Sequence, residues 1–222
     1  MRQTCLAGPE GRYGRMIAVG FTVFIVDDDP GVLKALTRLV RSAGYEVQAF
    51  ASPAEFLEHH DPIKPGCAVF DVALPGLDGL QLQEAITADS SHRPVIFITG
   101  RGDIPTSVRA MKAGAVDFLT KPVGDEELMA AIARARKRDA EERETHQEVM
   151  AIRQRLATLT PREREVLTHV IGGRLNKQIA GDLGTVEKTI KVHRGRMMAK
   201  MGVRTVAHLV LVAGKIGIQP DA

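Results

Sequence analysis

The sequence predicts a doubly wound α/β domain built on a five-stranded parallel sheet, followed by a long helical linker and a small all-helical domain. Three observations predict this arrangement. Short apolar runs alternate with helical patterns over residues 21–133, no glycine or proline interrupts residues 134–159, and residues 160–222 show helical patterns separated by glycines. The chain has 222 residues, of which 44% are hydrophobic and 26% are charged, so a folded protein is expected.

The first domain is expected to alternate strand and helix. The strand-length apolar runs are Thr22–Val26, Tyr45–Ala49, Cys67–Phe70, Val95–Ile98 and Val116–Leu119. The helical patterns between and after them are Gly31–Ala43, Pro53–His59, Leu80–Ala88, Thr106–Ala113 and Asp125–Arg138. Pro30, Pro53 and Pro105 stand where helices would begin, because a fixed φ suits the first turn. Fully apolar strands favour a parallel sheet that is buried on both faces.

Residues 1–20 are expected to form an irregular leader, in which Met16 competes with Met1 as the true start. The apolar run Met16–Val26 is 11 residues long and ends in aspartates, so it is too short for a membrane span and lacks a signal-peptide cleavage site. The two cysteines, Cys5 and Cys67, cannot form a disulfide framework or a four-ligand zinc site. These features predict a cytoplasmic protein with no membrane partner.

The linker, residues 134–159, has two interpretations. It could continue the preceding helix outward, with Val149, Ile152, Leu156 and Leu159 recurring at heptad spacing as a short coiled-coil seam. Alternatively, it is a solvated helix whose few apolar residues dock on the following domain. The sequence alone favours neither.

The all-helical domain, residues 160–222, is basic where the first domain is acidic. It carries 11 Lys and Arg against 5 Asp and Glu, whereas residues 21–133 carry 9 against 16. Its expected helices are Pro161–Ile171, Asn176–Leu183, Val186–Met201 and Arg204–Ala213. Short helices with tight glycine turns in a basic domain indicate a helix-turn-helix module, and the charge indicates a nucleic-acid partner.

Polar side chains gather at the carboxyl ends of the predicted strands, where ligands bind in open α/β sheets. Three carboxylates converging there repel one another unless a cation joins them, and oxygen ligands suit Mg²⁺. A hydroxyl and an ammonium opposite them would suit an incoming phosphoryl group. The residues are Asp27, Asp28, Asp71, Thr99 and Lys121.

Each of these residues also has a simpler interpretation. Asp27–Asp29 could merely cap a helix, Asp71 could be a turn residue, and Lys121–Pro122 could be a tight turn. Together the simpler interpretations require several coincidences at one edge of the sheet, which favours the pocket.

The ordered motifs Ile25–Asp29, Phe70–Gly79, Ile98–Gly100 and Ala113–Pro122 strongly resemble those of a response-regulator receiver domain. The resemblance implies that Asp71 accepts a phosphoryl group from a sensor histidine kinase. It also implies that Mg²⁺ is held by Asp27, Asp28, Asp71 and the backbone carbonyl of Ala73, that Thr99 and Phe118 form a switch pair, and that Lys121 contacts the phosphoryl group. The Lys121–Pro122 bond is expected to be cis.

The pattern of Val186–Met201 predicts a two-faced helix. At 100° per residue, Val186, Ile190, Met197 and Met201 fall on one side and should be buried. The opposite side is basic near its start and small near its centre, with Lys188, Lys191, Val192, Gly195, Arg196 and Ala199. Such a face can enter a major groove, where lysine reaches base acceptors and valine touches a thymine methyl group.

The motifs Leu159–Leu167, Asn176–Ala180 and Glu187–Arg194 closely resemble a LuxR-type DNA-binding domain. Joined to a receiver domain, they resemble the NarL/FixJ family of response regulators, and most closely its FixJ, StyR and TodT members. The resemblance implies that bases are contacted by Lys188, Lys191 and Val192, and phosphates by Thr160, Asn176, Lys177, Thr189 and Arg196. His193 is expected to be structural, and Arg194 is ambiguous.

Two positions depart from the family pattern. Val186 stands where the family usually has Ser or Thr, and a lost cap costs about 1 kcal/mol. Gly195 stands where a base contact is common, and glycine lowers helix propensity by about 1 kcal/mol.

The function expected from this resemblance is a DNA-binding response regulator, not an enzyme. Phosphorylation of Asp71 would control homodimerisation and the binding of promoter half-sites in double-stranded DNA. Val206, Leu209, Val210 and Ala213 form an apolar stripe that is a candidate dimer contact. One alternative is a Mg²⁺-dependent phosphohydrolase with a nucleic-acid-binding anchor, which would need an acidic residue where this chain has Ala73. Another is a DNA-binding protein with a vestigial receiver.

Overall fold

The computed structural model describes residues 20–88, 93–100 and 104–220, and divides the chain into two compact units, Met1–Glu142 and Arg143–Ala222. The units are described one at a time. Apart from Gly20, the expected leader, with its two candidate start residues, lies outside the described residues.

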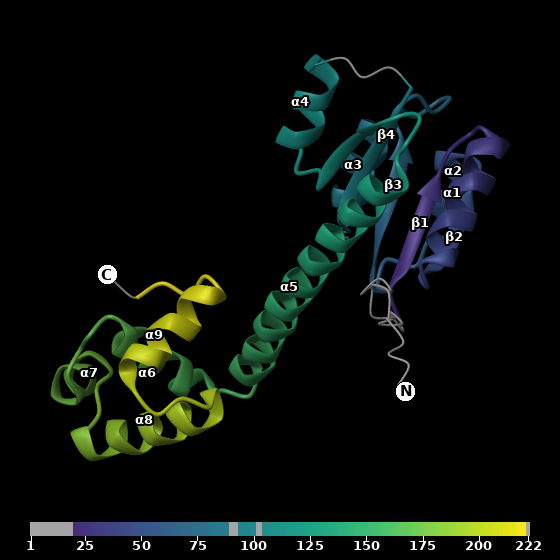
Figure 1. Cartoon of the computed structure of the whole chain (residues 1–222). Helices are drawn as coiled ribbons and strands as arrows, with labels where there is room; N and C mark the ends of the chain where they lie inside the picture. Colours follow the sequence, from purple (N-terminus) through teal and green to yellow (C-terminus); the bar gives the residue numbers. More distant parts are fainter. Residues whose placement is uncertain (1–19, 89–92, 101–103, 221–222) are drawn as a thin grey trace, which may run out of the picture. The chain divides into compact units, whose positions relative to one another are not determined.

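The first unit holds a five-stranded parallel sheet in the order β2-β1-β3-β4-β5 (Figure 1). Strands β1 and β3 are direct neighbours and pair in parallel from Thr22↔Gly66 to Val26↔Phe70. Their carboxyl ends therefore lie side by side. The bounds of β1 are as predicted, and those of the other strands differ from the predicted ones by at most one residue at either end. The strands are β1 Thr22–Val26, β2 Glu46–Phe50, β3 Gly66–Asp71, β4 Val95–Thr99 and β5 Asp117–Thr120.

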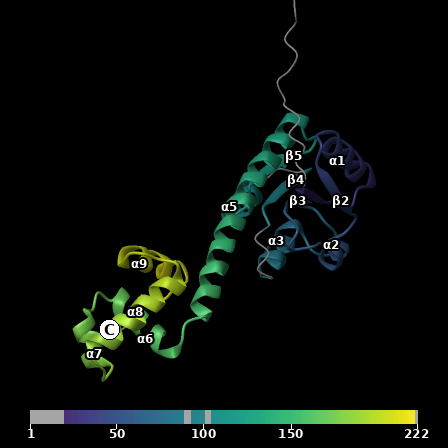
Figure 2. The same cartoon turned by 90° about the horizontal axis from the view of Figure 1, so that it is seen from below.

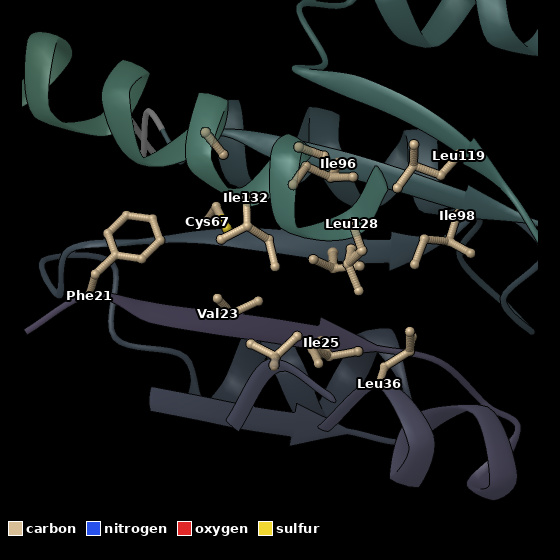
Figure 3. Close-up of a cluster of buried hydrophobic side chains, with 14 residues drawn as sticks. Phe21, Val23, Ile25, Leu36, Cys67, Ile96, Ile98, Leu119, Leu128 and Ile132 are labelled. Atoms are coloured by element: carbon tan, nitrogen blue, oxygen red, sulfur yellow. The ribbon is translucent and has the colours of Figure 1, made fainter. Parts of the chain in front are cut away.

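Helices cover both faces of this sheet, as predicted. Helices α1 (Pro30–Ser42) and α5 (Asp125–Ala157) pack on one face, and α2 (Pro53–His59), α3 (Gly79–Ala88) and α4 (Ile104–Lys112) on the other. Figure 3 shows the first of the two apolar clusters, in which Leu128 and Ile132 of α5 point toward the strands. Burying both faces of the sheet holds its carboxyl edge in a fixed geometry.

Helix starts follow local hydrogen bonding in this unit. The Asp29 carboxylate caps α1 by accepting from the amides of Gly31 and Val32, and the Ser52 hydroxyl caps α2 by accepting from the Glu55 amide. Prolines occupy the first turns of both helices, where no amide donor is needed. The simpler interpretation of the acidic run is therefore confirmed for Asp29.

Helix α5 runs unbroken from Asp125 to Ala157 (Figures 1 and 2), so the linker does continue the fifth helix. The open question about its apolar residues is also settled. Ile152 and Leu159 are 3% and 5% exposed in the core of the second unit, and Leu156 packs against that core. These three residues dock on the following domain, so the coiled-coil interpretation of the seam is wrong for them.

The second unit is all helical, with α6 Pro161–Ile171, α7 Asn176–Asp182, α8 Glu187–Met201 and α9 Val206–Lys215. Its core takes Ile190, Met197 and Met201 from α8, as predicted. The expected stripe on α9 is wrong for Leu209 and Ala213, which are buried in this same core and cannot contact a second copy. Val210 of that stripe is exposed, as is its neighbour Leu211.

No single described helix has the length and apolar content needed to cross a membrane. Among the described helices, α8 and α9 taken as a pair meet that test by length and composition alone, and they are bent by 56° relative to each other.

Candidate functional site

The carboxyl edge of the first unit's sheet brings together the acidic and basic side chains that the sequence predicts there. Asp27 directly follows β1, Asp71 is the last residue of β3, and Lys121 directly follows β5. The Lys121 ammonium donates to Asp27 Oδ2 and to Asp71 Oδ2, both at 2.7 Å. Asp27 is 1% exposed and Asp71 is 7% exposed, so one cation serves two buried carboxylates.

The remaining oxygens of these carboxylates are oriented by backbone amides. Asp27 Oδ1 accepts from the amide of Asp29 at 3.0 Å, and Asp71 Oδ1 accepts from the amide of Ala73 at 3.2 Å. The Lys121–Pro122 bond is cis, as the family resemblance implies. Because the Lys121 ammonium also donates to Asp27 and Asp71, the simpler interpretation of Lys121 as only a turn residue is wrong.

Negative charge in this pocket is only partly compensated. Burial raises the pKa of Asp27 above its ordinary value, and this outweighs the lowering by its hydrogen bond to Lys121. Burial alone would lower the pKa of Lys121, but the hydrogen bonds to Asp27 and Asp71 reverse this and raise it. Lys121 is thus held as a cation between two carboxylates that still lack full compensation.

A hard cation fits this donor set. Carboxylate oxygens of Asp27, Asp28 and Asp71 lie within 4.8 Å of one another, and Asp28 is exposed to solvent. All of these donors are oxygens, which divalent cations such as Mg²⁺ and Ca²⁺ prefer. The acidic cluster is therefore consistent with a metal site.

The two predicted switch residues lie on β4, the neighbour of β3, and on β5, the strand beyond β4. Thr99 is the last residue of β4 and is 3% exposed, and its carbonyl accepts from the Lys121 amide at 2.7 Å. Phe118, on β5, is half-buried, and its ring centroid lies 6.4 Å from that of Phe97. Phe97 lies at the same distance from Phe70, the residue before Asp71. The aromatic rings of Phe70, Phe97 and Phe118 thus form a continuous series from the residue before Asp71 to β5.

Gly79 has a role that sequence reasoning did not assign. A Cβ at this position would lie 2.4 Å from the backbone oxygen of Asp71 and 3.1 Å from the Phe97 ring. The start of α3 thus packs directly against the end of β3. The glycine lies within the quoted motif, but its local sequence does not reveal the close approach.

A second candidate site is the outer face of α8. Lys188, Lys191, Val192 and Arg196 are all exposed there, and Thr189 is half-buried. Lys177, on α7, is also exposed. Within the described part of the chain, none of these cations has an acidic partner within salt-bridge distance. The face is basic and uncompensated, as a phosphate-binding surface requires.

The remaining predicted contact residues also serve the fold. Asn176 Oδ1 accepts from Arg194 at 2.9 Å, which ties α7 to α8 and leaves the Asn176 amide group as its free donor. The Thr160 hydroxyl accepts from the Glu163 amide in a reciprocal cap at the start of α6. Arg194, ambiguous from the sequence, is thus a structural link between helices. His193 is half-buried, with its Nδ1 enclosed.

A buried ion pair holds α8 against the start of α6. Glu163 is 2% exposed, and its Oε2 accepts from Lys200 Nζ at 2.6 Å and from the Thr160 amide at 2.9 Å. Lys200 also donates to the carbonyl of Thr158 at 3.1 Å. The hydrogen bond from Lys200, followed by that from Thr160, lowers the pKa of Glu163 below its ordinary value.

Replacing Glu163 with glutamine is expected to destabilise the second unit by about 1–3 kcal/mol at pH 7, because a charge-assisted hydrogen bond is lost. A lowered folded-state pKa contributes stability above the ordinary pKa of 4.5 and loses it as the pH falls through the folded-state value. The difference between the two proteins should therefore shrink below about pH 4.5. Urea unfolding followed through the methyl NMR signals of Met197 and Met201 measures it, and a difference that persists at low pH would contradict the assignment.

Comparisons with known proteins identify both domains. Residues 23–133 match the response regulator receiver domain, and residues 157–213 match the bacterial regulatory proteins of the luxR family. The chain is 46% identical to Nodulation protein W of Bradyrhizobium diazoefficiens over 199 residues, covering 90% of this chain and 88% of that protein. It is 42% identical over 194 residues to the response regulator protein TodT of Pseudomonas putida strain F1, covering 87% and 86%.

A solved structure gives the same assignment. The low-resolution structure of the response regulator StyR is 47% identical, with a TM-score of 0.77 over 89% of this chain and all of that one. These families consist of regulators rather than enzymes, which sets the hydrolase alternative aside. The chain therefore belongs to the two-component response regulators that carry a receiver domain and a LuxR-type DNA-binding domain, the NarL/FixJ family.

Proposed function

We propose that Asp71 is the phosphoacceptor of this response regulator and that its phosphorylation controls pairing of the chain and its binding to promoter DNA. The observation that carries the proposal is the pocket in which Asp71, Asp27 and Lys121 share hydrogen bonds of 2.7 Å beside the exposed Asp28. We place the protein in the cytoplasm, because the phosphohistidine of a sensor kinase and chromosomal DNA are both accessible there.

The transfer is a nucleophilic displacement at phosphorus. An oxygen of the Asp71 carboxylate attacks the phosphorus of the kinase phosphohistidine, an O–P bond forms, and the P–N bond breaks. The electron pair stays on the imidazole nitrogen, which takes a proton from solvent. In this proposal Lys121 pairs with the phosphoryl oxygens, and the Thr99 hydroxyl donates to one of them.

Magnesium is the proposed cation at Asp27, Asp28 and Asp71, with the carbonyl of Ala73 as a further ligand. The donor set supports it, because all of these ligands are oxygens and one carboxylate is open to a hydrated ion. When bound, the ion supplies positive charge against the phosphoryl oxygens. Asp27 and Asp28 would orient the ion, and the ion would offset the repulsion between their carboxylates and that of Asp71.

The proposed switch runs from Thr99 and Phe118 to α4. When the Thr99 hydroxyl turns toward a phosphoryl group, the half-buried Phe118 repacks against Phe97 and the space beside α4 changes shape. Ile104, Val108 and Met111 on α4 are 78%, 44% and 49% exposed, so α4 offers an apolar surface for a second copy of the chain. Homodimerisation on phosphorylation is proposed through this surface.

Recognition of double-stranded DNA is assigned to the outer face of α8 and its surroundings. Bases would be contacted by Lys188, Lys191 and Val192, and phosphates by Lys177, Thr189 and Arg196 with the amide group of Asn176 and the exposed Thr160. A dimer would read two half-sites about one helical turn apart.

Capture of genomic DNA fragments by the full-length protein tests this function. The protein is compared with and without Mg²⁺ and beryllofluoride, which stands in for the phosphoryl group on Asp71. We expect a few two-fold-related sites to be enriched only in the activated state, together with a doubling of mass in sedimentation. Equal enrichment in both states would refute control by phosphorylation, and no enrichment in either state would refute DNA recognition.

A further inference from the structure

Val186 occupies an unexpected position at the start of the recognition helix. The helical wheel predicts that it is buried with Ile190, but its side chain is 65% exposed. The reason is that α8 begins only at Glu187, and Val186 has an extended backbone with φ −99° and ψ 149°. A residue outside the helix does not follow the rotation of 100° per residue, so its side chain leaves the buried stripe and points to solvent.

The stability of the free protein does not explain a valine at this position. Val186 is the N-cap residue of α8, and its side chain makes no capping hydrogen bond. A serine or threonine there would satisfy an orphan amide and stabilise the helix. It would also expose less apolar surface to water. Valine at this position therefore does not stabilise the free protein, and we look for its role in a contact with another molecule.

The position of Val186 identifies that partner. In helix-turn-helix proteins the N-terminal residues of the recognition helix meet base edges in the major groove. Lys188, Lys191 and Val192 of α8, all exposed, follow Val186 in the sequence. The thymine C5-methyl is the only apolar group among the base edges of the major groove, so an exposed valine there matches thymine.

We propose that Val186 is a specificity residue that reads a thymine methyl group in the half-site, separately from the thymine contact of Val192. The proposal rests on the DNA recognition assigned to α8 under the proposed function. One extended and five helical steps separate the two valines by about 11 Å along the helix. Because base pairs are about 3.4 Å apart, each half-site should contain two preferred thymines about three base pairs from one another.

Selection from a randomised duplex library tests the proposal with full-length protein activated by Mg²⁺ and beryllofluoride. The wild-type protein should enrich thymine at both positions. Val186→Ser supplies the missing cap and removes the apolar contact, so it should lose the thymine preference at one position and keep the other. Val192→Ala should show the reverse pattern.

Deoxyuridine identifies the atom that is read. In the selected duplex, exchanging the thymine assigned to Val186 for deoxyuridine removes only the methyl group. Wild-type binding should weaken about 3- to 5-fold, the effect of one buried methyl group. Binding by Val186→Ser should not change.

Leu175 gives a matched control. It is the N-cap residue of α7, its side chain makes no capping hydrogen bond, and it is 68% exposed. Leu175→Ser therefore makes the same chemical change on the helix that crosses the DNA backbone, and should leave both thymine preferences intact.

The outcomes separate this proposal from the proposed function. If Val186→Ser retains both thymine preferences, or weakens binding to every sequence equally, Val186 does not read a base and the proposal is overturned. If the wild-type protein itself enriches no sequence, DNA recognition by α8 fails and the proposed function is overturned along with this inference.

Discussion

Replacing Asp71 with asparagine is expected to abolish phosphorylation of the protein. The amide has the shape of the carboxylate but lacks its negative charge and its nucleophilic oxygen, so no acyl phosphate forms. Loss of a nucleophile in covalent catalysis lowers rates on the order of 10³-fold or more, so labelling should be undetectable. The measurement is incorporation of radiolabel from acetyl phosphate in the presence of Mg²⁺, with the same protein then tested for DNA capture.

Asp29→Asn is the matched control for this prediction. Asp29 lies in the same acidic run, but its carboxylate accepts from the amides of Gly31 and Val32 and caps α1. Asparagine is as good a cap as aspartate, so this variant should fold and accept label like the wild-type protein. Persistent labelling of Asp71→Asn would move the phosphoacceptor to another residue, and loss of labelling in Asp29→Asn would show that the assay reports only on folding.

The convergence of Asp27, Asp71 and Lys121 could be predicted from the sequence because topology dictates it. Each residue ends or follows a strand, and parallel strands deliver their carboxyl ends to one edge whatever the exact strand bounds. Errors of one residue at strand ends therefore do not move the site. The same reasoning could not separate Asp27 from Asp29, since both precede α1 and only the hydrogen bonds show which of them caps it.

The sequence predicts the burial of a helix residue less well in two cases: when the residue lies at a helix end, and when the apolar face could pack against more than one partner. Val186 follows the buried periodicity of α8, yet it lies outside the helix. Leu209 and Ala213 form an apolar stripe on α9, but the sequence does not say whether that stripe packs in the domain's own core or against a second copy. Ile152 poses the same question on α5. Periodicity identifies an apolar face, whereas its partner depends on tertiary packing.

Replacing Lys121 with methionine is expected to destabilise the first unit strongly in the absence of magnesium. Methionine preserves most of the side-chain volume, so the main change is the loss of a cation that hydrogen-bonds both Asp27 and Asp71. Removing one partner of a buried ion pair costs about 3–5 kcal/mol, because the remaining charge is left uncompensated. Lys121 is partly exposed, with a side-chain exposure of 21%, so about 3 kcal/mol is the expected loss. Urea unfolding followed through the amide NMR signals of β1 and β3 measures it.

Magnesium distinguishes this electrostatic explanation from simple damage to the fold. If the acidic cluster binds the cation, the ion replaces the missing charge and stabilises the folded state by mass action. Millimolar Mg²⁺ should therefore stabilise Lys121→Met more than it stabilises the wild-type protein, in which Lys121 already compensates part of the charge of the two carboxylates. Lys112→Met, an exposed lysine on α4, should behave like the wild-type protein with and without the ion. If Lys121→Met unfolds like the wild-type protein, the two carboxylates do not depend on this ammonium. If Mg²⁺ does not stabilise the variant, the two carboxylates do not form a metal site together with Asp28.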